Sequence, residues 1–172
     1  MRKHNGMRPQ DIPILLKILI LGEQIWQNKD LASQLYISPS EISESLNRSA
    51  MAGLIDADYK KKVYRQSLME FLEFGLHYVF PAIPEVMVNG IYTAHSHPRL
   101  EKEFNKESLP YVWPEPRGQV RGLSIEPLYK EQTKAVRQDE QLYYMLALLD
   151  ILRVGRVREL KFAISELKKI IL

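Results

Sequence analysis

The chain has 172 residues, of which 45% are hydrophobic and 26% are charged, which is enough for one domain with a real core or for a small domain with an extension. It contains no cysteine, which excludes disulfides and thiolate chemistry, and its net charge of +3 permits contact with nucleic acid without requiring it. The apolar run 12–21 is interrupted by Pro13 and Lys17 and is too short to span a bilayer, so we expect a cytoplasmic protein with no membrane partner.

The first predicted helix begins at Asp11, which can cap it, and ends at Gly22. Its apolar residues form two stripes, the first of Ile12, Leu15, Leu16 and Leu19 and the second of Ile14, Ile18 and Leu21. A helix that is apolar on two faces is buried on two sides. We expect the residues that follow to cover one side, and the C-terminal helices or a second subunit to cover the other.

Residues 31–55, LASQLYISPSEISESLNRSAMAGLI, predict two helices joined by a tight turn. Asn28 can cap the first helix. Ser38 can cap the second by accepting from the amide of Glu41, whose side chain would reach back to the amide of Ser38. Pro39 suits the first helical position, and Gly53 suits the left-handed residue that ends the helix.

A small sheet, the wing, is predicted beside this helix pair. Residues 54–55 and 63–64 form its main strands, and 25–26 form a short edge strand. The tip, 56–62, carries the densest basic run of the chain, which consists of Lys60, Lys61 and Lys62. Cations on such a loop bind phosphates by releasing counterions, and the alternative is a solvated loop.

The pattern LA, two residues, L, then IS, then S-x-x-x-IS-x-x-LNR, then AGLI resembles bacterial winged helix-turn-helix regulators, the MarR type among them. The resemblance covers residues 11–65, roughly a third of the chain. Tyr36 stands where the tight turn usually carries a small residue, so we expect that turn to be displaced. The stretch PYVWPEPRGQVRGLSIEPLY resembles a segment of poorly characterised bacterial proteins that also begin with a winged helix.

Residues 81–127 differ from the rest of the chain, because they contain seven of the ten prolines and show no long helical periodicity. A helix opened by a capping box of Ser67 and Glu70 is expected to end where this segment begins. Within the segment we expect a turn at Asn89–Gly90 and a short helix over 99–106. Aromatic residues persist, so we predict an ordered, extended segment wrapped over the helical core, with burial of Tyr92, Phe104, Tyr111, Trp113 and Tyr129.

From about Arg137 the helical period returns, and Gly155 breaks it. A heptad seam follows the break, formed by Val157, Leu160, Ile164, Leu167 and Ile171. Two heptads are too short for a free coiled coil, so this helix must pack on something. Together with the second stripe of the first helix, the seam predicts a homodimer built from the N- and C-terminal helices.

Motifs of catalysis and cofactor binding are missing from the sequence, among them the phosphate loop, the dinucleotide fingerprint, G-x-S-x-G and H-E-x-x-H. We therefore expect no enzyme activity, no catalytic residue and no cofactor. His95 and His97 have metal-ligand character, but a metal site would need a further ligand, and a polar surface loop is the preferred interpretation. Arg117 and Arg121 are expected on an exposed hairpin, where contact with a phosphate or an acidic partner is the alternative.

We predict a mainly α fold with a small β wing. A winged helix-turn-helix DNA-binding domain would occupy 1–80, an extended Pro-rich segment 81–130, and a C-terminal helical hairpin for dimerisation 131–172. The predicted function is sequence-specific transcriptional regulation, as a repressor, by a homodimer on double-stranded DNA. The predicted DNA-binding residues are Ser38, Ser40, Glu41, Ser43, Glu44, Asn47, Arg48, Lys60, Lys61, Lys62 and Arg65.

The charge of the second helix opposes this function. Glu41 and Glu44 outweigh Arg48 between residues 38 and 52, which leaves −1, and carboxylates repel phosphate although they can accept from cytosine. Asn47 would read adenine and Arg48 guanine or a phosphate, while affinity would depend on the wing and on a basic arm with Arg2, Lys3 and Arg8. The alternative is a winged-helix module, such as an antitoxin or adaptor, that binds a protein partner and no DNA.

Overall fold

The computed structural model describes residues 6–104 and 108–172, and the chain divides into two compact units. The first unit contains residues 1–68 and 128–142, and the second contains 69–127 and 143–172. Most of the secondary structure is helical, with one small three-stranded sheet, which confirms the prediction of a mainly α fold. The division differs from the three predicted segments, because residues 128–142 group with the N-terminal part of the chain.

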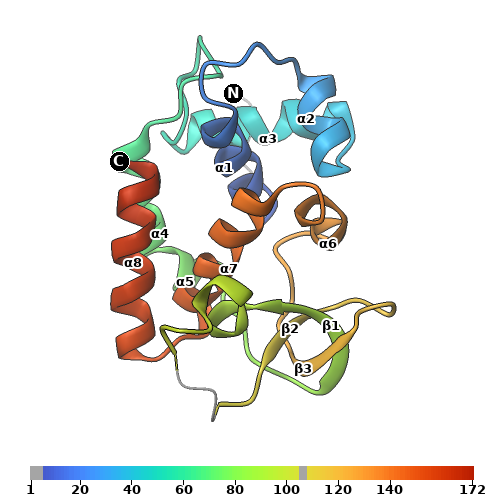
Figure 1. The fold of residues 1–172 in the computed structure, drawn as a ribbon. Coiled ribbons are helices and arrows are strands. Elements are labelled where there is room, and N and C mark those ends of the chain that lie inside the picture. The colour runs from blue at the N-terminus through green and yellow to red at the C-terminus, as the bar shows by residue number, and fades with distance from the viewer. Residues whose placement is uncertain (1–5, 105–107) are drawn as a thin grey trace. The chain divides into compact units, whose positions relative to one another are not determined.

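Three helices form most of the first unit: α1 (Asp11–Leu21), α2 (Asn28–Leu35) and α3 (Pro39–Met51); the short α6 (Gln132–Val136) is added from the later part of the chain (Figure 1). α1 ends as predicted at Gly22, which has a φ of 55°. The second stripe of α1 is buried within the chain, since Ile14, Ile18 and Leu21 are at most 8% exposed. The prediction that this stripe offers a surface to a second subunit is therefore wrong.

The turn between α2 and α3 passes through Tyr36, a left-handed residue with a φ of 57° whose amide donates to the carbonyl of Ala32. The N-cap of α2 is Gln27, one residue before the predicted Asn28, and the carboxylate of Asp30 accepts from the Gln27 amide at 2.7 Å. The predicted strand at 25–26 does not form. Ile25 is 98% exposed, and of the two residues only Trp26 is buried.

The C-terminus of α3 leads into a short hairpin, residues 54–64. Gly53 has a φ of 74°, and the amide of Leu54 donates to the carbonyl of Ser49 at 2.9 Å, which closes the helix end as predicted. Ile55 and Val63 form an antiparallel bridge, flanked by a bond from the Asp56 amide to the carbonyl of Lys62. We call these residues the 54–64 hairpin.

The second unit contains the end of α4 (Arg65–Phe74), α5 (Leu76–Val79), most of α7 (Glu140–Val154) and α8 (Val157–Ile171). α4 begins two residues before Ser67, so the predicted capping box there is wrong. The helix breaks at Gly75, where an added Cβ would lie 3.0 Å from the carbonyl oxygen of Phe71. The break at Gly155 is confirmed, and α7 begins at Glu140, three residues after Arg137, where the helical period was predicted to return.

The sheet of the second unit consists of β1 (Met87–Thr93), β2 (Tyr111–Pro114) and β3 (Val120–Ser124), and each strand pairs with both others. Gly90 lies inside β1. The strand needs a glycine there, because an added Cβ would be 2.1 Å from the carbonyl oxygen of Trp113. The predicted turn at Asn89–Gly90 is therefore wrong. Arg117 and Arg121 are exposed, as predicted. They do not lie on a hairpin, because β2 and β3 pair in parallel.

Two short 3₁₀ turns, Ala94–Ser96 and Pro98–Leu100, follow β1. The turn Pro98–Leu100 overlaps the start of the predicted helix over 99–106, and no further helix follows it up to residue 104. Residues 105–107 lie outside the described part of the chain. His95 and His97 are 9% and 0% exposed, so the predicted polar surface loop is wrong.

Asp150 of α7 attaches the sheet to the helices of the second unit. Its carboxylate accepts from Thr93 Oγ1 at 2.7 Å, from Trp113 Nε1 at 2.6 Å and from Arg153 Nη1 at 2.8 Å. Asp150 is 1% exposed and Trp113 is 0% exposed. The Pro-rich segment is thus ordered around a buried aromatic side chain, as predicted for Trp113, and forms a sheet.

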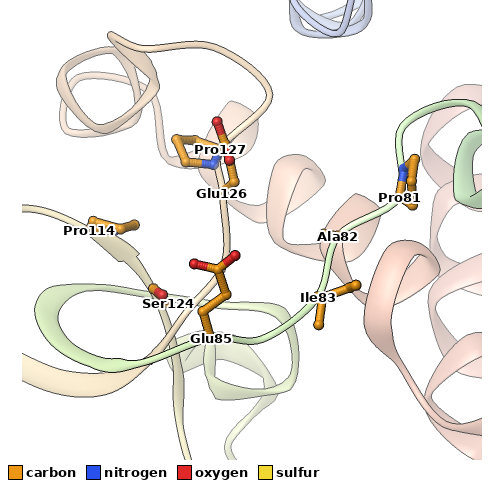
Figure 2. Close-up of a pocket in the computed structure, with 8 residues that line it drawn as sticks. All are labelled: Pro81, Ala82, Ile83, Glu85, Pro114, Ser124, Glu126 and Pro127. Carbon is orange, nitrogen blue, oxygen red and sulfur yellow. The ribbon is translucent and has the colours of Figure 1, made fainter.

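A pocket of about 430 Å³ opens in the second unit between the segment that follows α5 and the end of β3 (Figure 2). Pro81, Ile83 and Glu85 line it from the first segment, and Ser124 and Glu126 from the second. Prolines therefore form part of a concave surface.

α8 carries the predicted heptad seam, but the seam is not a continuous exposed stripe. Val157 is 69% exposed, whereas Leu167 and Ile171 are 0% exposed within the chain. The prediction that this seam is largely a dimer surface is wrong for its C-terminal half. Among the helices of the described ranges, none is both long and apolar enough to cross a membrane.

His97 should make the stability of the fold depend on pH. Burial, followed by the nearby charge of Arg99, lowers the pKa of His97 from 6.5 to about 4. Its Nδ1 accepts from the Arg99 amide at 3.1 Å, and its ring lies 4.1 Å from that of Tyr143, so protonation at Nδ1 would break the bond. Because the unfolded chain binds the proton first, the free energy of unfolding should fall by about 2–3 kcal/mol as pH drops from 6.5 to 4.

Urea unfolding at several pH values measures this fall, and the His97→Gln variant should lack it. His77→Gln is the matched control at an exposed histidine, with glutamine retaining a donor for the carbonyl of Arg153, which lies 2.9 Å from His77 Nδ1. Equal pH profiles for the parent chain and His97→Gln would show that His97 does not couple protonation to folding.

Candidate nucleic-acid interface

The N-terminal half of α3 presents small polar side chains to solvent. Ser38 caps the helix by accepting from the Glu41 amide at 3.3 Å, as predicted. The exposed positions are Ser38, Ser40, Ser43 and Glu44. Asn47, one turn after Ser43, is half-buried. Five of the predicted DNA-binding residues therefore share one face or its border.

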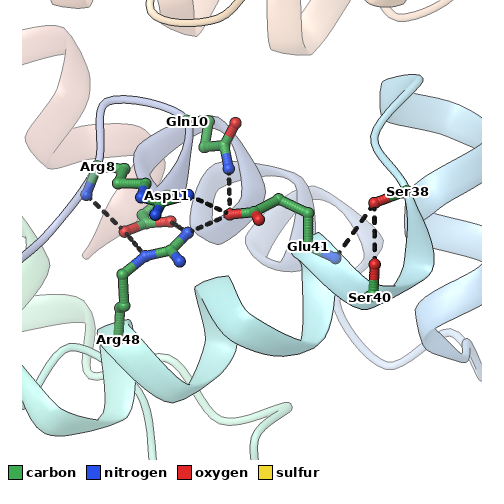
Figure 3. A network of polar contacts seen from close by, with 7 residues as sticks. All are labelled: Arg8, Gln10, Asp11, Ser38, Ser40, Glu41 and Arg48. Atoms are coloured by element: carbon green, nitrogen blue, oxygen red, sulfur yellow. Dashed lines mark hydrogen bonds and ion pairs between the residues drawn. The ribbon is translucent and has the colours of Figure 1, made fainter. Parts of the chain in front are cut away.

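Arg48 is not outward, contrary to the prediction. Its side chain is 9% exposed and makes a bidentate ion pair with Asp11 of α1, with Nε donating to Oδ2 at 2.9 Å and Nη2 to Oδ1 at 2.7 Å (Figure 3). Hydrogen bonding to Asp11, the largest cause, and then to Glu41 raises the pKa of Arg48 despite the cost of burial. Arg48 therefore joins α3 to α1 and is removed from the candidate DNA contacts.

Glu41 does not reach back to the amide of Ser38, because its carboxylate belongs to the same network. Oε1 accepts from Arg48 Nη2 at 2.7 Å, from Gln10 Nε2 at 2.5 Å and from Arg8 Nη1 at 3.3 Å (Figure 3). Asp11 and Glu41 thus face Arg8 and Arg48, two negative charges against two positive ones. The helix charge of −1 therefore overstates the repulsion that a phosphate would meet at Glu41.

Two of the three hairpin lysines contact the rest of the first unit. Lys60 Nζ donates to Asn47 Oδ1, which joins the 54–64 hairpin to the exposed face of α3. Lys61 Nζ donates to the carbonyl of Trp26 at 2.5 Å and lies 4.7 Å from the centre of its ring. Lys62 is exposed at the end of the hairpin, and Arg65 is exposed at the start of α4.

A basic pocket of about 330 Å³ lies beside the hairpin in the first unit. Lys61, Lys62 and Arg65 line it, and Glu23 is the one carboxylate among its lining residues. Trp26 and Tyr59 add aromatic walls. Sequence reasoning missed both aromatic residues as part of the site, although the run Tyr59 to Lys62 was the available signal.

Other predicted contacts lie elsewhere or outside the described residues. Arg2 and Lys3 of the basic arm fall in the part that the structure does not describe. Within residues 6–104 and 108–172, no group of three or more histidine, cysteine or acidic side chains is arranged to hold a metal ion. His95 instead places Nε2 3.2 Å from the carbonyl oxygen of Leu109.

The polar face of α3, the hairpin lysines and the basic pocket are all formed within the first unit. Comparison of the chain with protein-family models, with curated protein sequences and with solved structures gives no match. The functional argument therefore rests on the geometry of these residues.

Proposed function

We propose that the chain is a DNA-binding transcriptional regulator of the winged helix-turn-helix type. In this proposal α2 and α3 form the helix-turn-helix, and the 54–64 hairpin is the wing. The observation that carries it is the hydrogen bond between Lys60 and Asn47, which places a lysine-bearing hairpin against the polar face of α3. A helix that enters the major groove needs such a polar face, and a cationic loop beside it can bind the adjacent phosphates.

The residues divide into two classes of contact. Ser40 and Ser43 would contact base edges, Asn47 would do so through its amide NH2 because its Oδ1 accepts from Lys60, and Glu44 would accept from the amino group of cytosine. Lys62 and Arg65 would contact phosphates, together with the lysines already bound at the hairpin. The balanced network of Asp11, Glu41, Arg8 and Arg48 supports this assignment, because it removes an uncompensated carboxylate from the groove-facing side.

The proposal includes a pair of chains on each site, because helix-turn-helix regulators commonly read two half-sites related by a two-fold axis. The buried stripe of α1 and the buried end of the α8 seam do not supply the contact between the two chains. Two copies could therefore be brought together by adjacent half-sites on the DNA.

A second candidate function is a winged-helix module that binds a protein partner. The observation in its favour is that Lys60 and Lys61 already have intramolecular partners, Asn47 and the carbonyl of Trp26. Lysines used in this way stabilise the hairpin without any nucleic acid. Selection of random DNA duplexes at low salt separates the two functions, because only a DNA-binding chain enriches a sequence.

The hairpin should act through phosphates and α3 through bases. Lys62→Ala should weaken binding to the selected duplex and to random duplexes by the same factor. It should also make the slope of log affinity against log salt concentration shallower by about 0.9 for each phosphate that the variant no longer binds. Ser43→Ala should cost about 1–3 kcal/mol on the selected site and much less on random DNA, because base contacts specify the sequence. Fluorescence anisotropy at several salt concentrations measures both effects.

Lys161→Ala provides the matched control, since Lys161 is an exposed lysine on α8 in the second unit. It should leave the salt slope unchanged. If no sequence is enriched and Lys62→Ala binds DNA as the parent chain does, the regulator proposal fails and the protein-binding module becomes the better account.

A further inference from the structure

The Pro-rich pocket of the second unit contains two carboxylates and no cation among its lining residues. Glu85 and Glu126 lie on the two segments that border it, and Figure 2 shows the Glu85 carboxylate pointing toward the side where Glu126 and Pro127 lie. Neither carboxylate forms a hydrogen bond or ion pair with the described residues. The surrounding walls are apolar and are formed largely by Pro81, Ile83, Pro114 and Pro127.

A hydroxyl of a buried residue also borders this pocket. Ser124, at the end of β3, is 8% exposed and lines the pocket beside Glu85 (Figure 2). Its Oγ has no hydrogen-bond partner within the part of the chain that the structure describes. The residue is mostly buried, but its Oγ is accessible from the pocket, so the hydroxyl can bond to a polar group that enters there.

Buried backbone contacts hold the two borders of the pocket in place. Arg153 donates through Nε to the carbonyl of Phe80 at 2.8 Å and through Nη1 to the carbonyl of Glu126 at 3.0 Å. The amide of Glu85 donates to the carbonyl of Ser124 at 3.1 Å. The positive charge of Arg153 is itself matched by Asp150, so it does not cancel the charge of the pocket carboxylates. The pocket is therefore held in a fixed shape with a net negative charge.

We propose that this pocket binds an organic cation, a guanidinium or alkylammonium group whose apolar stem lies against the prolines. The cationic head would be bound by Glu85 and Glu126 and would satisfy the Ser124 hydroxyl as an acceptor. Two carboxylates among apolar walls do not provide the six or more oxygen ligands that Ca²⁺ takes, or the near-octahedral oxygen shell of Mg²⁺. The ligand is either a small-molecule cation or the basic side chain of a protein partner. The inference does not depend on DNA binding, because the pocket lies in the second unit.

Titration of the full-length chain with n-butylguanidinium, followed by ¹H–¹⁵N NMR, tests this site. The amide signals of Glu85, Ser124 and Glu126 should shift, whereas butylurea, which has nearly the same shape and no charge, should not shift them. Glu85→Gln and Glu126→Gln should each weaken binding by about threefold to tenfold, since each removes one charge from a partly exposed site. Glu103→Gln, at an exposed glutamate of the same unit, should have no effect.

A blocked peptide, acetyl-Gly-Arg-Gly-amide, distinguishes the two sources of the cation. Binding at least tenfold tighter than n-butylguanidinium supports a basic side chain of a protein, and equal or weaker binding supports a small molecule. The proposal is overturned if butylurea shifts the same amides equally, if the two glutamine variants bind as the parent chain does, or if equimolar Mg²⁺ displaces n-butylguanidinium. Amide spectra of each variant without ligand show whether it remains folded.

Discussion

Replacing Asp11 by asparagine should lower the free energy of unfolding by about 3–5 kcal/mol, because it leaves Arg48 buried without its bidentate partner. Asp11 is 0% exposed, and the side chain of Arg48 is 9% exposed, so water cannot readily replace the missing carboxylate. Asparagine keeps one oxygen, which can still accept from the Arg8 amide, now 2.8 Å from Asp11 Oδ2, but its NH2 group faces a guanidinium nitrogen as donor against donor. Urea unfolding followed by circular dichroism measures the change.

A double variant, Asp11→Asn with Arg48→Met, separates the charge from the packing. Methionine fills much of the space of the arginine stem without a charge, so the double variant should recover most of the stability that the single variant lacks. Asp58→Asn, at an exposed aspartate of the 54–64 hairpin, is the control and should change stability little. A single variant as stable as the parent would mean that the ion pair does not hold α3 against α1.

Replacing Asp150 by alanine should destabilise the second unit by about 3–5 kcal/mol. The carboxylate accepts from Thr93, Trp113 and Arg153, all of which are at most 4% exposed. Its removal leaves a buried guanidinium without a counter-charge and two buried donors without an acceptor. Thermal unfolding measures the destabilisation, and the fluorescence of Trp113, measured in a Trp26→Phe background because both tryptophans are buried, reports whether the sheet loosens first.

Thr93→Val is the graded companion of Asp150→Ala, since it removes one donor and leaves the ion pair intact. It should cost about 1 kcal/mol. If the two variants cost the same, the ion pair between Asp150 and Arg153 does not contribute to the attachment of the sheet.

Helical periodicity predicted α1, α2, α3, α7 and α8, because each carries a long apolar pattern bounded by a capping residue or a glycine. The glycines at 22, 53 and 155 marked helix ends correctly. Gly90 misled the prediction, because Asn-Gly is also a turn signal. Its actual role depends on the approach of the Trp113 carbonyl, a contact across 23 residues that no local pattern contains.

The candidate site was predictable as a set of positions and less so as a set of roles. Ser38, Ser40 and Ser43 follow from the helix phase alone. Arg48 pairs with Asp11 across 37 residues, and the choice between an outward and an inward arginine depends on that distant partner. The pocket carboxylates Glu85 and Glu126 are brought together by pairing near the end of β3, which the Pro-rich sequence did not indicate.

The closed pairing of the three strands has a consequence for how copies of this chain behave at high concentration. An open sheet ends in two outer strands whose unpaired amides and carbonyls can recruit a strand from another molecule. Here β1 pairs with β2 over Gly90–Thr93 and with β3 over Met87–Gly90, and β2 pairs with β3 at Tyr111 and Val112, so no strand is unpaired along a whole edge. The second unit thereby shortens the open strand edges that its β-rich, aromatic sequence would offer to another molecule.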